Sequence, residues 1–234
     1  MTRFDENVSD SLNITTFRDF LNKTYLVLCL GLILSAAFAY LGSVLILVLP
    51  ATVAIAAMVI AIIAELVVAF TFTGRLMKMS RNTAWICYLL YSALTGISLS
   101  FVIMSYTASS VIQAFLSAAV LFACMAMIGY TTKLDLSRFG TMFLAGLVAT
   151  LITSLLNVFL LHSSTVSLGL CYFGIILFLG LIAYDMQRLK DLYQQGLYDS
   201  VIGEKLLIYG AFQLYLDFIN LFLRLLRLFG RRRD

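Results

Sequence analysis

Charge is scarce in this chain: 12% of its 234 residues are Asp, Glu, Lys or Arg, and the formal net charge is +4. A soluble domain carries about a quarter charged residues, so a soluble enzyme or a nucleic-acid-binding domain is excluded. Hydrophobic residues make up 62% of the sequence, and the mean hydropathy is +1.00. These values predict a helical membrane protein with little chain left for domains outside the bilayer.

Cysteine and histidine are also rare, and their spacing indicates no metal or redox site. Cys29, Cys87, Cys124 and Cys171 lie in separate apolar stretches without a CxxC pair. This distribution is typical of small packing residues in membrane helices. His162 is the single histidine and stands without ligand partners. The sequence therefore predicts neither a bound metal nor a disulfide framework.

Apolar segments long enough to cross a bilayer follow one another along the chain. All of them are expected to be helices, because an open sheet leaves backbone groups unpaired in lipid. The prediction is an all-α seven-helix bundle at 24–230, between a tail at 1–23 and a basic tail at 231–234. The expected spans are about 24–43, 50–73, 84–105, 111–130, 141–161, 166–186 and 205–229.

Lysine and arginine are distributed unevenly between the two ends of the spans. They stand before the first span and in the connections between spans two and three, four and five, and six and seven. The connections 42–50, 105–111 and 161–166 contain none. The positive-inside rule therefore predicts a cytoplasmic N-terminus.

The last segment carries charged groups at membrane depth, where each costs about 2.5–3.5 kcal/mol. Gln213, Asp217, Asn220 and Arg224 recur at helical spacing and form a polar stripe on one face. Lipid cannot solvate this stripe, so the sequence predicts that the other six helices surround this one. The arginines of the segment conflict with the positive-inside rule. Either the segment enters without crossing, or packing overrides its charge bias.

Three further ionisable residues lie within spans or at their ends. Asp185 closes the sixth span, where the spacing fits an inward-facing carboxylate and a solvated one equally well. Arg75 ends the second span on the same side, either as an interfacial anchor or as an ion-pair partner inside the bundle. Glu65 lies about 15 Å further along that helix and is a second candidate cavity carboxylate.

The run LYLDFINLFLRLLRLFG at 214–230 closely resembles the last helix of the Bax inhibitor family, in particular its bacterial YccA-like members. This is a family of small multi-pass membrane proteins. The resemblance covers nearly the whole chain after the first helix. It extends to AYDMQRLKDLY (183–193), GYTTKLDLSRFG (129–140), LLNVFL (155–160), LTGISLS (94–100) and FTGRLMKMS (72–80).

The resemblance implies a pH-gated calcium-leak channel of the bacterial inner membrane, with six helices around a central seventh. The family's two gating aspartates match Asp185 and Asp217, and an arginine partner matches Arg75, with Lys78 as the alternative. The stripe residues of the last helix and Glu65 would line the pore. Ca²⁺ would be the permeant ion, held transiently by the two aspartates, and no cofactor is expected. Bacterial relatives also bind an FtsH-type membrane protease through an N-terminal tail, which residues 1–23 would supply.

The chemistry of a two-carboxylate gate is consistent with that implication. Two carboxylates close together in a medium of low dielectric cannot both ionise cheaply, so they share a proton and titrate as one unit. When deprotonated, the pair offers the hard oxygen ligands that Ca²⁺ prefers.

Two other classes of function remain open. One is a regulator without a pore that acts through protein contacts. The other is an intramembrane aspartyl protease, which also pairs a Tyr-Asp motif with a second aspartate. That class is disfavoured, because its GxGD motif is replaced here by LYLDF and the single proline is Pro50, which leaves no Pro-Ala-Leu signature. An enzyme is therefore not predicted.

Overall fold

The computed structural model describes residues 17–194 and 200–231. Within these residues every regular element is helical, and seven helices are long and apolar enough to cross a membrane. The predicted all-α seven-helix fold is therefore confirmed. The helices are α2 (Phe17–Val48), α3 (Ala51–Arg75), α4 (Arg81–Met104), α5 (Ala108–Thr131), α6 (Gly140–Leu156), α7 (Ser164–Gln194) and α8 (Ser200–Phe229). The short turns are η1 (Leu76–Lys78), η2 (Leu136–Phe139) and the π-helical η3 (Asn157–Leu161), which continues α6.

Several helices extend beyond the expected spans. α2 begins at Phe17, so the last part of the expected tail 1–23 is helical, while 1–16 lie outside the described residues. The polar first turns of α2 are held by aromatic packing, since the ring of Phe17 stacks on Tyr130 and contacts Tyr193. Hydropathy marks only the part of a helix that lies in lipid, so it misses such extensions.

Side-chain caps begin three of the elements, as polar residues before a helix commonly do. Ser80 accepts a hydrogen bond from the Thr83 N–H at the start of α4, and Thr107 accepts one from Ser110 at the start of α5. Asp135 caps η2, accepting a hydrogen bond from the Ser137 N–H. The hydrogen bonds from Ser137, with the adjacent Arg138, lower the pKa of Asp135. Asp135 is therefore charged at neutral pH and fixes the α5–α6 connection.

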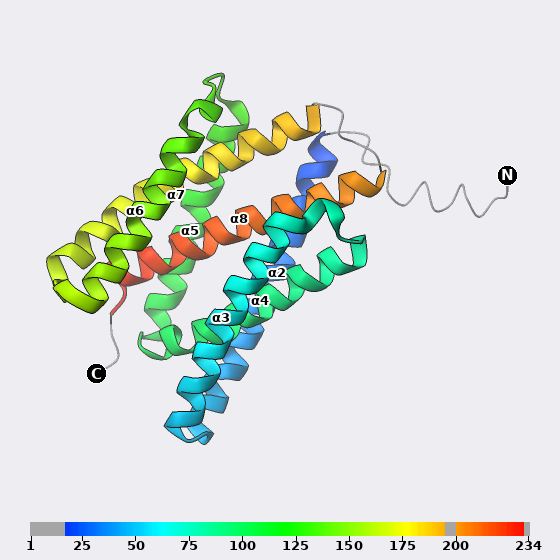
Figure 1. Cartoon of the computed structure of the whole chain (residues 1–234). Helices are drawn as coiled ribbons and strands as arrows, with labels where there is room; N and C mark the ends of the chain where they lie inside the picture. The colour runs from blue at the N-terminus through cyan, green and yellow to red at the C-terminus, as the bar shows by residue number, and fades with distance from the viewer. Residues whose placement is uncertain (1–16, 195–199, 232–234) are drawn as a thin grey trace.

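The last helix occupies the centre of the bundle, as its polar stripe predicts. Buried residues make up 72% of its most apolar stretch, against 11–39% in the other six helices. Figure 1 shows α8 running obliquely between a group formed by α2, α3 and α4 and a group formed by α5, α6 and α7. α2, α4, α5 and α7 pack closely against α8, whereas α3 and α6 lie further out and pack mainly on α4 and α7.

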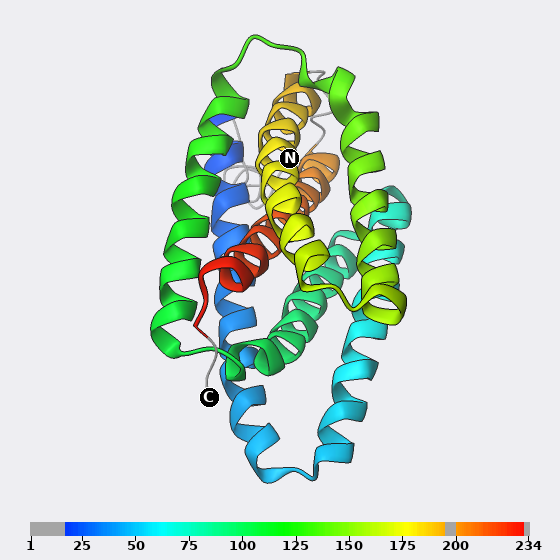
Figure 2. The ribbon, with the colours of Figure 1, turned by 90° about the vertical axis from the view of Figure 1, so that its left-hand side faces the viewer.

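α8 passes through the whole bundle, which decides between the two alternatives that its arginines leave open. Beyond its last turn, the carbonyl of Arg231 accepts a hydrogen bond from Thr107 at 3.1 Å, and its N–H donates to the Ser110 hydroxyl at 2.9 Å. The α4–α5 connection thus holds the end of α8. Figure 2 shows this end on the same side as the α2–α3 turn, opposite the start of α2. The two ends of α8 therefore lie at opposite ends of the bundle, as expected for a helix that crosses it.

A buried hydrogen-bond network ties α8 to α2 and α4. The hydroxyl of Ser35 on α2 lies 2.6 Å from the hydroxyl of Tyr215 on α8 and 2.7 Å from the carbonyl of Ser92 on α4. Tyr215 and Ser92 are fully buried. Such contacts between polar groups hold membrane helices in register.

Replacing Tyr215 by Phe should therefore destabilise the bundle, because the Ser35 hydroxyl loses its hydrogen bond to Tyr215 and keeps only its bonds to backbone carbonyls. We expect a loss of about 1 kcal/mol, or a fall of about 2–4 °C in the thermal unfolding midpoint in detergent. Tyr172→Phe on the lipid-facing side of α7, where the ring is 55% exposed, is the matched control and should leave the midpoint unchanged. Equal midpoints for the two variants would show that the network contributes nothing.

Candidate functional site

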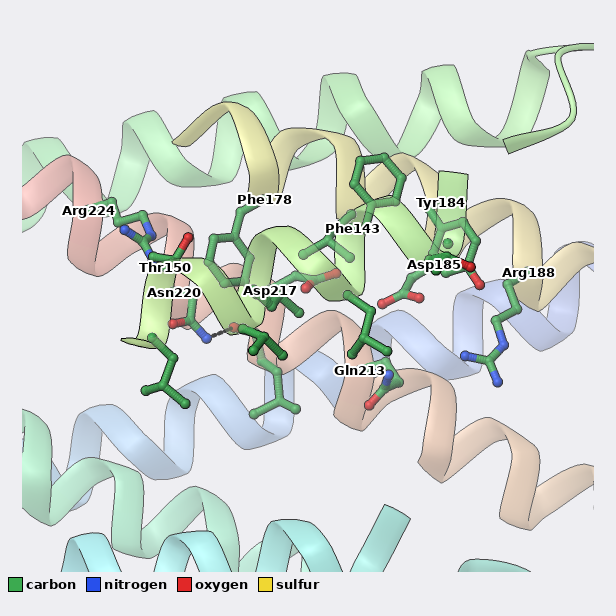
Figure 3. Close-up of a pocket in the computed structure, with 18 of the residues that line it drawn as sticks. Phe143, Thr150, Phe178, Tyr184, Asp185, Arg188, Gln213, Asp217, Asn220 and Arg224 are labelled. Atoms are coloured by element: carbon green, nitrogen blue, oxygen red, sulfur yellow. Dashed lines mark hydrogen bonds between the residues drawn. The ribbon is translucent and has the colours of Figure 1, made fainter. Parts of the chain in front are cut away.

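A cavity of about 820 Å³ lies between α6, α7 and α8. Its α6 wall is mostly apolar, with hydroxyl groups at Thr150 and Ser154. Figure 3 shows a row of polar side chains opposite that wall, from Arg224 at one end to Arg188 at the other. The whole polar stripe of α8 faces this cavity. Its polar lining from α7 and α8 is Asp185, Arg188, Gln213, Asp217, Asn220 and Arg224.

The two aspartates singled out in the sequence come together in this cavity. Asp185 on α7 is 7% exposed and Asp217 on α8 is 5% exposed. Figure 3 shows their carboxyl groups directed toward one another, and the two groups interact directly. Oδ2 of Asp217 is buried and has no hydrogen-bond partner within the described part of the chain. The pair is thus desolvated, and one of its oxygens is free to accept a proton or a ligand.

Rotation of α7 explains why Asp185 faces inward. It shares a helical face with Ile182, Met186 and Leu189, which are 0%, 1% and 3% exposed. Burial of this apolar face against α8 and α5 carries the carboxylate into the interior with it. The spacing allows Asp185 to face either inward or toward solvent, and in the structure it faces inward.

The expected ion pair between Arg75 and Asp185 is absent from the residues that the structure describes. Arg75 and Lys78 are both exposed at the end of α3 and in η1, respectively. Arg188 takes the place next to the carboxylate instead: it lies one turn along α7 from Asp185, lines the same cavity, and stacks over the ring of Tyr209 at 5.9 Å. Arg75 is separated from the pair because α3 contributes no residue to the lining of the aspartate cavity, which lies between α6, α7 and α8.

Glu65 lies in a different cavity, of about 240 Å³, on the α3 and α4 side of α8. Its carboxylate accepts a hydrogen bond from the hydroxyl of Ser98. Asn220 and Leu216 line both cavities, so a single wall formed by α8 separates them. Glu65 is therefore not part of the aspartate site, although it faces a polar interior.

A smaller cavity of about 260 Å³ adjoins the aspartate cavity at its Arg188 end. The two share Ser137, Tyr184 and Arg188, and the smaller one adds Gln187 and Asp191. Polar groups therefore continue from the carboxylate pair toward the loop between α5 and α6. These polar groups lie near the ends of helices, where the sequence pattern alone predicts side chains exposed to solvent.

Sequence reasoning missed Arg188 and the contribution of α6. Arg188 stands three residues after Asp185, a spacing that places both on one helix face, so a signal for it existed. Thr150 and Ser154 give no such signal, because hydroxyl residues are common in membrane helices and α6 is otherwise uniformly apolar. The charged pair Arg81–Glu204, which joins the starts of α4 and α8, is likewise not evident from the sequence.

The acidic and amide side chains of the cavity do not make up a full set of metal ligands. Within the described residues, no group of three or more His, Cys, Asp or Glu side chains is placed to hold a metal ion. Ca²⁺ takes six to eight oxygen ligands in a resident site. Two carboxylates beside amide and hydroxyl groups would hold such an ion only weakly.

Comparison with known proteins places the chain among bacterial membrane proteins. Residues 17–234 match the family model described as Bax1-I, inhibitor of apoptosis-promoting Bax1. The inner membrane protein YbhL of Escherichia coli (strain K12) is 44% identical over 173 residues, 74% of each chain. A protein of Borreliella burgdorferi is 37% identical over 219 residues, 92% of this chain and 93% of that one. A membrane protein of Streptococcus pyogenes serotype M6 is 40% identical over 171 residues, 73% of each.

Proposed function

The chain belongs to the Bax inhibitor family of multi-pass membrane proteins, and from that premise we propose that it is a pH-sensitive calcium-leak channel gated by Asp185 and Asp217. The site that binds the permeant ion is the cavity between α6, α7 and α8. In this proposal the pair binds ions and protons and has no catalytic role. The protein acts in the inner membrane of a bacterium, with its N-terminus in the cytoplasm.

The observation that carries the proposal is the burial of two facing carboxyl groups inside a membrane bundle. Asp185 and Asp217 are 7% and 5% exposed and lie in a cavity large enough for a hydrated ion. Carboxyl groups at this depth are expensive, and among the described residues neither forms a salt bridge with a lysine or arginine. An ion pair holding the fold together would need such a cation, so the arrangement supports a functional role.

The same geometry explains how pH would act on the cavity. With one proton shared, the two carboxyl groups attract one another and hold α7 against α8. When that proton is lost, two like charges face each other in a medium of low dielectric and repel, unless a cation lies between them. Protonation and Ca²⁺ thus compete for the same oxygens, and both bias the packing of α7 on α8.

Flux of Ca²⁺ into liposomes loaded with a calcium-sensitive dye tests the proposal. We expect a leak that requires the protein and changes with pH between about 6 and 8. Absence of a leak at any pH in that range would contradict it. That result would favour a regulator that binds an FtsH-type membrane protease through the N-terminal tail, of which residues 1–16 lie outside the described structure.

The proposed orientation has its own test, by thiol labelling in intact cells. In a variant without native cysteines, Val48→Cys at the α2–α3 turn and Ser164→Cys at the start of α7 should react with an impermeant maleimide from outside. Leu134→Cys, in the α5–α6 connection and 71% exposed, should react only after the membrane is opened. The reverse pattern would place the N-terminus outside.

A further inference from the structure

Arg224 lies at the end of the large cavity away from Asp185, in a place that α7 forms for it. Its Nη1 donates a hydrogen bond to the carbonyl of Leu170 at 2.9 Å. Its guanidinium lies over the ring of Phe178, with Cζ 5.2 Å from the ring centre. Gly174 leaves the space between them open, because a Cβ at that position would collide with the guanidinium. The side chain is thus held in the bundle instead of extending toward the end of α8.

Within the described residues, no counter-charge accompanies this cation. Neither of the ion pairs Arg81–Glu204 and Arg138–Asp135 involves Arg224. Its Nε is buried and makes no hydrogen bond there. Asp217 stands two helical turns away, about 10 Å along α8. A guanidinium is charged at every physiological pH, so even partial burial without an anion is unfavourable.

The cavity at this point has the features of an anion site. It borders Arg224 on one side and the hydroxyl-bearing residues Thr150 and Ser154 of α6 on the other. Arg224 stands five residues before the last residue of α8, about 7.5 Å along the helix, within reach of the headgroup layer. The planar guanidinium is suited to phosphate, which it binds through paired hydrogen bonds. Arg227, one turn further on, is exposed and does not line this cavity.

We propose that the Arg224 end of the cavity binds a phosphate group, supplied by a lipid headgroup or by free phosphate. The bound phosphate neutralises the half-buried guanidinium and holds α6 to α7 and α8 through the hydroxyl groups of Thr150 and Ser154. This site is distinct from the aspartate pair at the other end of the cavity. It does not depend on whether the protein conducts calcium.

The test is the thermal unfolding midpoint of the full chain in a maltoside detergent, which contains no phosphate. Inorganic phosphate is added in place of sodium chloride at constant ionic strength, and short-chain phosphatidylglycerol is added in a second series. A probe that binds should raise the midpoint by about 3 °C at ten times its dissociation constant. A response to the lipid alone identifies the headgroup as the source, and a response to both probes identifies the phosphate itself.

Arg224→Gln should lose the response, whereas Arg227→Gln, the matched exposed arginine on the same helix, should keep it. Gly174→Ala provides a second variant that retains the charge: the added methyl group moves the flexible guanidinium out of its place, so the response should again be lost. The proposal is overturned if neither probe raises the midpoint of the wild-type protein. It is equally overturned if Gly174→Ala and Arg224→Gln respond as the wild type does.

Discussion

Replacing either Asp185 or Asp217 by Asn should remove most of the pH dependence of the calcium leak, and replacing both should remove little more. The two carboxyl groups face each other in one cavity, and in the proposed gate they share a proton, so neither would titrate independently. Asn has nearly the same shape as Asp, which separates loss of titration from loss of packing. The pH-dependent part of the flux should fall about fivefold or more in each single variant, with strong non-additivity in the double variant.

The measurement is Ca²⁺ flux into dye-loaded liposomes at several pH values between about 6 and 8, at equal protein density. Asp135→Asn serves as the control, because that carboxylate lies in the exposed α5–α6 connection and pairs locally with Arg138. It should leave the pH profile unchanged. A profile that survives in the double variant would show that another group senses pH, and Glu65 in the cavity beside α3 would be the next residue to replace.

Gly129→Ala should destabilise the bundle more than any other single methyl addition near the site. The helices α5 and α7 touch at this residue, and an added Cβ would lie 2.7 Å from the Cα of Ala183 and close to two other backbone atoms of that residue. Backbone cannot move aside as a side chain can, so α7 has to shift. Overpacking of this kind costs about 1–3 kcal/mol, which corresponds to a fall of about 2–12 °C in the unfolding midpoint.

Gly169→Ala is the matched control, since nothing lies within 4 Å of a Cβ at that position on α7. It should be neutral or slightly stabilising, because Ala is a better helix former than Gly. Both midpoints are measured in the same detergent. Ala183 stands two residues before Asp185, so Gly129→Ala should also alter the pH profile of the leak. Similar stability of the two variants would mean that α5 and α7 are less tightly packed than the structure has them.

The sequence is most informative where an energetically expensive feature recurs at a helical period. Four polar residues at that spacing in an otherwise apolar helix require an interior, and this requirement alone predicts that α8 lies at the centre of the bundle. The same cost marks Asp217 as a candidate functional residue. The free-energy cost of a charge in lipid singles out this residue, so the prediction depends little on the neighbouring sequence.

At the end of a helix a charged side chain can reach water, so this cost disappears. The sequence then no longer distinguishes an inward-facing charged residue from a solvated one. The family resemblance implies that Arg75 pairs with Asp185, and both lie at the same end of their spans. Position along the span does not say which way a helix is rotated or which helix is its neighbour. The structure puts Arg188 beside Asp185. The sequence does not predict the cavities either. They arise because α6 and α3 lie at some distance from α8, and nothing in the apolar sequences of these helices indicates that distance.

The thin wall that α6 forms has a consequence for the protein's response to its membrane. One side of this helix borders the cavity, and its other side carries Met142, Ile152 and Leu155, which are 58%, 52% and 50% exposed and face the acyl chains. A single helix therefore stands between the carboxylate pair and the hydrocarbon. A change in bilayer thickness or lateral pressure that moved α6 would alter the width of the cavity without disturbing the packing of α8. The lipid composition of the membrane is, in this arrangement, a mechanical input to the site.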